Sequence, residues 1–405
     1  MRRRTVTTAL TAALTGTAAA SVAAPALADG RSGEGSSGRA GSGRGGAGRQ
    51  EDRPPQLLLD GTGLYPRVVR LAHQGAADDR LLASVVSFDG PSGYGGIWES
   101  PDDGTTFTQV GAVSDDALEA GEGLCCATLY ELPRAVGDLP EGTLLWSASV
   151  GADLPDRRMS IRIWASTDVG RSWDRIAITA VAANEGGLWE PEFALTDDDT
   201  LVLWFCDETD GENHSQKIVQ QTSVDGLTWT DPTPTIELED PAARPGMPNV
   251  RRLRTGSWAM SYEICGPEDY CRSYVRTADD PRDWGPVTAR DPLVRAADGT
   301  EPRHTPTLTI DADGSVLLGS QMHYTADGEV SEHNGKVVLR SQNRALAGRI
   351  RWMTEPAPVP VEDPWNNYCP NYSPTYVRTD SGHLLEITSA PTDEGVCRPW
   401  YGSLG

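Results

Sequence analysis

The chain has 405 residues and a formal net charge of −23 at pH 7, with 58 acidic and 35 basic side chains. A surface this acidic repels phosphate backbones and anionic lipid headgroups, so we expect neither nucleic acid nor a membrane as partner. The six histidines and seven cysteines show no zinc-ribbon spacing and no His-Glu-x-x-His motif. We therefore expect no metal and no cofactor.

The N-terminal segment has the organisation of an export signal. Met1–Arg4 is positively charged, an Ala/Thr/Val/Leu-rich stretch follows, and Ala26–Ala28 supplies the small residues of a cleavage site. We predict a signal peptide over residues 1–28 and a disordered Gly/Ser/Arg-rich linker over 29–55. No later segment has the apolar length of a membrane span, so we expect residues 56–405 to form the folded domain of a secreted, extracellular protein.

One short pattern recurs through this domain. It reads Ser100-Pro-Asp-Asp-Gly-Thr-Thr-Phe107, Ser166-Thr-Asp-Val-Gly-Arg-Ser-Trp173 and Ser223-Val-Asp-Gly-Leu-Thr-Trp229, with a degenerate copy over 277–284. Ser and Asp side chains can bond the backbone of a turn, Gly tolerates positive φ, and the final aromatic packs the turn onto its neighbour. We therefore assign Asp168 and Asp225 a structural role.

The spacing of the copies indicates the architecture. A unit of about 60 residues suits one four-stranded antiparallel sheet with its loops. Residues 56–400 accommodate five to six such units, so we predict an all-β propeller closed by its termini. The alternative is a large β-sandwich with unrelated Asp-Gly turns.

Cysteines in an exported chain indicate disulfides. Cys265 and Cys271 flank a short Gly-Pro loop and are the first predicted pair, and Cys369 with Cys397 is the second. The remaining three are Cys125, Cys126 and Cys206. One of these three must be unpaired or the pairing must be unusual.

Two glutamates lie in apolar or aromatic surroundings that would raise the pKa of a carboxyl group. Glu190 lies between Trp and Pro, and Glu263 belongs to the Trp258–Ile264 segment, whose alternation predicts a strand with Tyr262 on the opposite face. The inner strand ends of a propeller line its central funnel, where two carboxylates could form the pair that glycoside hydrolysis requires. The alternative role of either glutamate is to bond buried backbone groups or an arginine.

The recurring turn resembles the Asp box, or BNR repeat, of the sialidase superfamily. The segments between the turns resemble glycoside hydrolase family 93, the exo-α-1,5-L-arabinanases that release arabinobiose. The segments that carry this resemblance are Leu64–Leu71, Leu129–Pro133, Trp189–Pro191, Ser215–Ser223, Arg244–Pro248 and Tyr262–Glu263.

This resemblance implies a six-bladed β-propeller and a retaining exo-hydrolase with two catalytic glutamates. These would be Glu190 in Trp-Glu-Pro and Glu263 in Tyr-Glu, and either could be the nucleophile. The implied substrate is an arabinan-like polysaccharide or oligosaccharide, and we expect a monomer.

Further residues are predicted to bind the substrate. Arg67 and Arg244 could hold sugar hydroxyls, or instead clamp neighbouring blades. Trp189 and Tyr262 could stack on a sugar face, or instead belong to the core. The other candidates are Gln216, Lys217 and His304, the last of which could instead be an exposed loop residue.

Two other functions are compatible with a propeller. An exo-sialidase would use a tyrosine nucleophile and several arginines around the sugar carboxylate, and a different furanosidase would resemble the arabinanases closely. A non-catalytic carbohydrate-binding propeller is the more distant alternative, because a fold alone does not determine a function.

Overall fold

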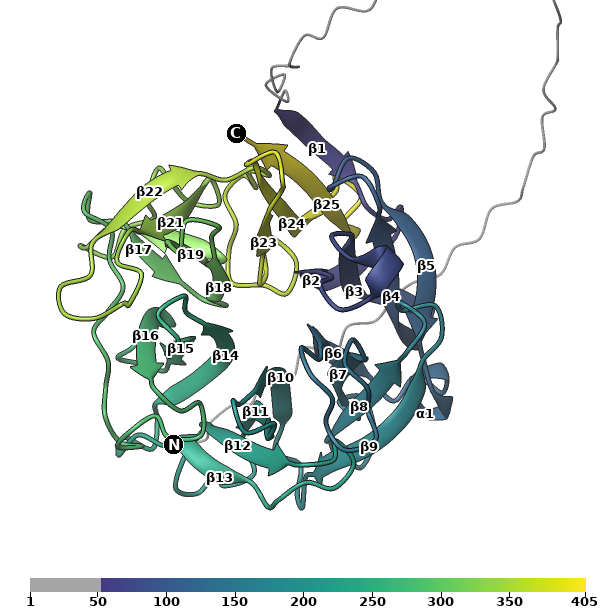
Figure 1. Cartoon of the computed structure of the whole chain (residues 1–405). Helices are drawn as coiled ribbons and strands as arrows, with labels where there is room; N and C mark the ends of the chain where they lie inside the picture. The colour runs from purple at the N-terminus through teal and green to yellow at the C-terminus, as the bar shows by residue number, and fades with distance from the viewer. Residues whose placement is uncertain (1–51) are drawn as a thin grey trace, which may run out of the picture. The chain divides into compact units, whose positions relative to one another are not determined.

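The computed structural model describes residues 52–405, which form six β-sheets arranged as blades around a central axis (Figure 1). The predicted signal peptide and most of the predicted linker lie outside the described residues. Each blade is antiparallel, and its first strand lies next to the axis. The prediction of an all-β, six-bladed propeller is confirmed.

The first three blades have four strands each. Blade 1 contains β2 (Gly63–Arg70), β3 (Leu81–Asp89), β4 (Ser92–Ser100) and β5 (Thr108–Val113). Blade 2 contains β6 (Leu124–Glu131), β7 (Leu144–Val150), β8 (Ser160–Ser166) and β9 (Asp174–Val181). Blade 3 contains β10 (Leu188–Leu195), β11 (Leu201–Asp207), β12 (Lys217–Ser223) and β13 (Thr233–Ile236).

The other blades complete the ring, and the fourth has an additional strand. Blade 4 contains β14 (Arg244–Arg252), β15 (Trp258–Cys265), β16 (Arg272–Ala278), β17 (Glu301–Arg303) and β20 (Met322–Tyr324). Blade 5 contains β18 (Thr307–Ile310), β19 (Val316–Gly319), β21 (Val337–Ser341) and β22 (Trp352–Pro356). Blade 6 contains β23 (Thr375–Arg378), β24 (Leu384–Pro391), β25 (Cys397–Leu404) and β1 (Arg53–Leu57).

The first and last strands of the described region lie together in blade 6, as predicted. The N-terminal β1 pairs with the C-terminal β25, and Leu57 lies opposite Trp400. Because β1 begins at Arg53, residues 53–55 of the predicted linker belong to the propeller. The prolines among them, Pro54 and Pro55, are tolerated because β1 is the outermost strand, where backbone N–H groups need no partner within the sheet.

The recurring turns connect the third and fourth strands of their blades. In the turn after β12, Asp225 Oδ1 accepts hydrogen bonds from the backbone N–H groups of Thr228 (2.7 Å) and Leu227 (2.8 Å). These bonds lower the pKa of Asp225 to about 2. The Trp229 indole N–H donates to the carbonyl of Gly226, so the aromatic residue anchors the turn. The structural role expected for Asp225 is consistent with these contacts.

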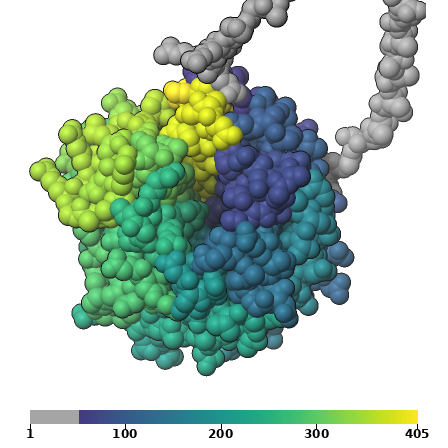
Figure 2. Space-filling view, in the orientation of Figure 1, coloured from purple at the N-terminus to yellow at the C-terminus, as the bar shows by residue number. Residues whose placement is uncertain are grey.

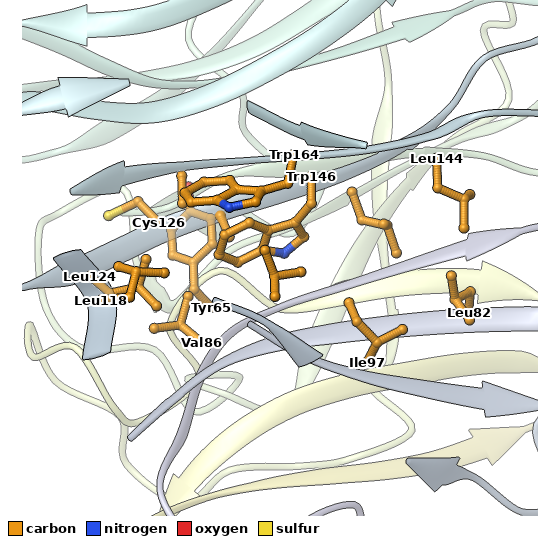
Figure 3. Close-up of a cluster of buried hydrophobic side chains, with 14 of the residues drawn as sticks. Tyr65, Leu82, Val86, Ile97, Leu118, Leu124, Cys126, Leu144, Trp146 and Trp164 are labelled. Carbon is orange, nitrogen blue, oxygen red and sulfur yellow. The ribbon is translucent and has the colours of Figure 1, made fainter. Parts of the chain in front are cut away.

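Hydrophobic side chains fill the spaces between adjacent blades. In the cluster between blades 1 and 2, Trp146 and Trp164 are fully buried and pack edge to face, with ring centroids 5.3 Å apart (Figure 3). Tyr65 and Cys126 belong to the same cluster and also reach the axis. The core and the wall of the central cavity are therefore continuous.

Helices are short in the described part of the chain. The structure has a 3-10 turn η1 (Gly75–Ala77) and an α-helix α1 (Asp116–Glu119), whose first turn is capped by Asp115. Within residues 52–405, no helix has the length and apolar character needed to cross a membrane.

All seven cysteines lie in the described region. The two predicted disulfides, Cys265–Cys271 and Cys369–Cys397, are both present. The unusual pairing falls on the neighbouring residues Cys125 and Cys126, which are joined to each other. Cys206 is the free, buried cysteine.

Candidate active site

A cavity of about 710 Å³ lies where the inner strands converge. Blades 1 and 2 contribute apolar side chains to its wall, including Leu64, Val86 and Leu124. Blades 3 and 4 contribute polar groups, including Glu190 and Glu263. The space-filling view shows a hollow near the centre of the molecular face (Figure 2). The cavity volume and its mixed lining are typical of a small-molecule site.

The innermost strands share a backbone distortion that turns side chains toward the axis. In β2, β6, β10 and β14 the register shifts at one place, and the shift contains a non-glycine residue with positive φ. These residues are Tyr65 (52°), Cys126 (60°), Glu190 (62°) and Met247 (57°). Such conformations cost about 1–3 kcal/mol each and persist where the surrounding structure holds them. β-Bulges with this character are common beside active sites.

Glu190 is held by two donors at one carboxyl oxygen. Its Oε2 accepts hydrogen bonds from the Cys206 thiol and from the backbone N–H of Met247, both at 2.9 Å. Burial, reinforced by the negative charge of Glu263, raises the pKa of Glu190 to about 7 despite these donors. Glu190 is therefore partly protonated at neutral pH.

Glu263 has a different environment. It is 5% exposed, and its Oε2 accepts from the backbone N–H of Thr305 at 2.6 Å and lies 3.0 Å from His304 Nδ1. Burial opposes protonation of His304, but the charge of Glu263 and the hydrogen bonds to Glu263 and Asn366 outweigh it and raise the pKa of His304. One carboxyl oxygen of Glu263 therefore faces a backbone N–H donor and the imidazole ring of His304.

Gly246 lies next to both glutamates. It pairs with Glu263 across β14 and β15, and a Cβ placed on it would lie 3.6 Å from Glu190 Oε2. The same Cβ would lie 2.4 Å from the side-chain amide of Gln216. A larger residue at position 246 would therefore clash with the side chain of Gln216, which would have to move, whereas its contact with Glu190 would be an ordinary one.

The predicted residues Arg244 and Gln216 form a polar network beside Glu190. Arg244 donates to Glu208 and to the side-chain oxygen of Gln216 (2.7 Å), and Gln216 donates to the carbonyl of Pro245 (3.0 Å). Burial acts against ionisation of Glu208, but the hydrogen bonds and charge of Arg244 hold its pKa below the usual value. The network presents paired charges and amide groups to the cavity.

Six of the nine predicted site residues line this cavity together. They are Trp189, Glu190, Gln216, Arg244, Glu263 and His304. The side chain of His304 is 12% exposed, so the alternative of an exposed loop residue does not apply to it. The indole of Trp189 also lies 5.0 Å from the guanidinium of Arg157.

The other three predicted residues are not in the cavity wall. Arg67 is buried beneath the ring of Tyr65, 4.2 Å from its centroid, and donates to Ser373 Oγ at 3.0 Å. These contacts match the alternative role of a clamp between blades. Tyr262 is fully buried and donates its hydroxyl to Asp291 at 2.6 Å, so it matches the alternative of a core residue.

The Lys217 side chain also lies outside the cavity wall. Its ammonium group lies 3.1 Å from Asp210 and 3.8 Å from Glu237. The side chain is thus engaged in partly buried ion pairs and is not in the cavity wall.

Several lining residues were not anticipated from the sequence. They are Tyr65, Cys125, Cys126, Glu208, Asn366, Tyr368 and Tyr372. A signal exists for one of them, Tyr65, because the positive-φ residue of a blade is followed by proline in Tyr65-Pro66, Glu190-Pro191, Met247-Pro248, Thr305-Pro306 and Ser373-Pro374. Proline has no backbone N–H, so it suits the unpaired position of a bulge.

One group of side chains near Glu263 has the spacing of metal ligands. It combines Glu263 and His304 with Cys265 and Cys271. The two sulfur atoms are joined in a disulfide and offer no thiolate, which is the form of cysteine that binds metals. The donor set therefore does not fit a metal ion.

No protein-family model matches the sequence, and no curated protein sequence matches it. Solved structures do match. The α-L-arabinanase of Penicillium chrysogenum in complex with arabinobiose has a TM-score of 0.70 at 23% identity, over 87% of this chain and 96% of that one. The family 93 α-L-arabinofuranosidase of Fusarium graminearum with arabinobiose has a TM-score of 0.70 at 24% identity, over 88% and 98%. The NanB sialidase of Streptococcus pneumoniae has a TM-score of 0.56 at 11% identity, over 86% and 70%.

These comparisons establish a shared fold. The structural neighbours of the chain are glycoside hydrolases of family 93 and a sialidase, and the similarity to the family 93 enzymes is the stronger of the two. The fold predicted from the resemblance in sequence motifs is thereby confirmed.

Proposed function

We propose that the protein is a secreted, retaining exo-glycoside hydrolase that releases arabinobiose from the non-reducing end of α-1,5-L-arabinan. Glu190 is the proposed acid and base, and Glu263 the proposed nucleophile. The observation that carries this proposal is that two glutamates from neighbouring blades line one cavity, and that burial raises the pKa of Glu190 to about 7, as a general acid requires. Glu263 is assigned the other role, and one of its carboxyl oxygens contacts the backbone N–H of Thr305 and the ring of His304.

The proposed reaction has two steps. Glu190 donates its proton to the glycosidic oxygen as the bond to the leaving sugar breaks, and Glu263 attacks the anomeric carbon to form a glycosyl-enzyme. Glu190, now ionised, takes a proton from water, which attacks the anomeric carbon and releases Glu263. Because Cys206 and Met247 occupy Oε2 of Glu190, we propose that its Oε1 carries the transferred proton.

The substrate assignment is supported by two kinds of observation. Structural neighbours from Penicillium chrysogenum and Fusarium graminearum were solved with arabinobiose. The cavity wall combines apolar side chains with amide and carboxyl groups, which suits a neutral sugar. The three disulfides are consistent with export, because disulfides persist in oxidising compartments.

A sialidase activity is less compatible with this cavity. Of the described residues, Arg244 is the one arginine in the cavity wall, and it is already paired with Glu208. Tyr65 and Tyr372 are available as phenols, but burial raises the pKa of both well above the usual value and disfavours the ionised nucleophile. A sugar carboxylate would therefore find no free cluster of arginines here.

The test is incubation with linear α-1,5-arabinan, with the products separated by chromatography and the anomeric configuration followed by NMR. We expect arabinobiose as the early product, with retained configuration. Cleavage of a sialoside or of another arabinofuranoside, with no release from arabinan, would overturn the substrate assignment.

Variants test the roles of the two glutamates. We expect Glu190→Gln and Glu263→Gln each to lose at least about 1000-fold in kcat on arabinan, and the exposed Glu185→Gln to be unaffected. With a nitrophenyl glycoside, the leaving group departs without protonation, so Glu190→Gln should retain a burst of nitrophenol that Glu263→Gln lacks. The reverse pattern would exchange the two roles, and retention of sugar binding without any turnover in the wild type would indicate a lectin.

A further inference from the structure

The segment Trp365–Tyr368, between β22 and β23, lies at the cavity and exposes two large aromatic side chains. Asn366, Asn367 and Tyr368 are part of the cavity wall. Trp365 is 53% exposed and Tyr368 is 70% exposed. Exposed apolar surface that gathers beside a cavity marks a candidate ligand-binding groove.

Hydrogen bonds and a disulfide hold the segment Trp365–Tyr368 in place. Asn366 Oδ1 lies 3.0 Å from His304 Nε2, and Gln321 Nε2 donates to the carbonyls of Asn367 (2.6 Å) and Pro370 (2.9 Å). The disulfide Cys369–Cys397 joins the end of the segment to β25. A ligand that binds to the aromatic rings would therefore lose little additional freedom of the segment on binding.

The rings continue from the inner wall of the cavity to its rim. The ring centroids of Tyr65 and Tyr372 lie 6.1 Å apart, and those of Tyr372 and Tyr368 lie 5.7 Å apart. The ring of His304, which contacts Glu263, lies 5.6 Å from Tyr372. The exposed Tyr368 thus continues a row of rings that begins beside the catalytic candidates.

We propose that Trp365 and Tyr368 form an outer sugar platform, which binds the part of a neutral polysaccharide chain that extends beyond the cavity. This inference rests on the proposed function and adds that the enzyme prefers polymer to short oligosaccharide. Aromatic faces provide large apolar contact area with a polar group at one edge, and Asn366 and Asn367 add amide groups between them. The net charge of −23, with Glu362 and Asp363 just before the platform, disfavours an anionic chain.

The test compares Trp365→Ala and Tyr368→Ala with Leu227→Ala, which removes a 49% exposed side chain from the turn after β12. We expect each aromatic variant to raise KM for long arabinan about fivefold with a smaller effect on kcat, and to lower the polymer-to-nitrophenyl ratio of kcat/KM. Leu227→Ala should match the wild type on both substrates. An unchanged ratio would refute the platform, as would equal losses on polymer and nitrophenyl substrate.

Binding without turnover separates this inference from the proposed function. Glu263→Gln, with and without the aromatic substitutions, is run in gels that contain arabinan or another neutral polysaccharide. Retardation that depends on Trp365 and Tyr368 supports the platform even if the wild type hydrolyses no arabinan. If arabinan is hydrolysed but retardation is independent of both residues, the platform is refuted and the proposed function stands. Self-association that the substitutions abolish, measured by sedimentation, would identify a second copy of the chain as the occupant.

Discussion

Replacement of Cys206 tests whether a buried thiol adjusts the acidity of Glu190. Cys206 lies on β11 opposite Trp189, is fully buried, and donates its S–H to Glu190 Oε2 at 2.9 Å. Burial, together with the nearby charge of Glu190, raises the pKa of the thiol well above its usual value. The group therefore remains a protonated donor throughout the range of an activity assay.

The size of the effect follows from the strength of this hydrogen bond. A donor to a charged group contributes about 1.5–3 kcal/mol, and a thiol is weaker, so about 1 kcal/mol is reasonable. Since one pKa unit corresponds to about 1.4 kcal/mol, loss of the thiol in Cys206→Ala should raise the pKa of Glu190 by about 0.7 unit. Cys206→Ser places a stronger donor at the same position and should lower it.

The assay is the pH dependence of kcat/KM. The proposed acid must be protonated, so the rate should fall as pH rises through about 7, the pKa of Glu190. The alkaline limb should move to higher pH in Cys206→Ala and to lower pH in Cys206→Ser. Thermal unfolding of both variants reports any loss of packing separately. Shifts of both variants in the same direction, or no shift in either, would refute the reasoning.

Two further predictions concern stability. Gly95→Ala would place a Cβ 2.5 Å from the fully buried ring of Trp146, so we expect urea denaturation to show a free energy of unfolding lower by about 1–3 kcal/mol. The control Gly61→Ala, whose Cβ has contacts no closer than 3.7 Å, should be nearly neutral. Equal stabilities of the two variants would contradict the packing argument. Burial raises the pKa of Glu386 to about 8, although the Val359 N–H and the Tyr376 hydroxyl donate hydrogen bonds to its carboxyl group. The contribution of Glu386 to the free energy of unfolding is therefore complete below its unfolded pKa near 4.5 and is lost as pH rises through about 8. The free energy of unfolding of Glu386→Gln relative to wild type should therefore increase between these pH values, and a difference that does not depend on pH would exclude a protonated Glu386.

The propeller architecture was predictable because the turn residues form hydrogen bonds within their own short segment of the chain. The Ser and Asp residues of each repeat bond the backbone within four residues, as Asp225 does with Leu227 and Thr228. Such local bonds need no tertiary partner, so their spacing indicates the length of one blade, and the length of the domain then allows five to six blades. The disulfide Cys265–Cys271 was predictable for the same reason, since the two cysteines are only six positions apart in the sequence.

The substrate-binding residues were only partly predictable, because a bulge changes which face a side chain occupies. Regular alternation had already placed Tyr262 on the face opposite Glu263, and the structure buries it there. In β2, by contrast, the register shift between Leu64 and Arg67 brings Tyr65 to the cavity and leaves Arg67 beneath it. Proline after the bulged residue was the available signal.

Sequence alone thus determined the repeat, the propeller and the two glutamates as candidates, because these depend on local turn chemistry and on short motifs. Only the tertiary structure decided that Glu190 and Glu263 share one cavity, and that burial there raises the pKa of Glu190. Ring closure brings together β10, β15 and the residues before β18, and the donors that distinguish the carboxyl groups come from three separate segments, at Cys206, Met247 and Thr305. The acidity of a buried carboxyl group depends on such distant partners, which no local pattern encodes.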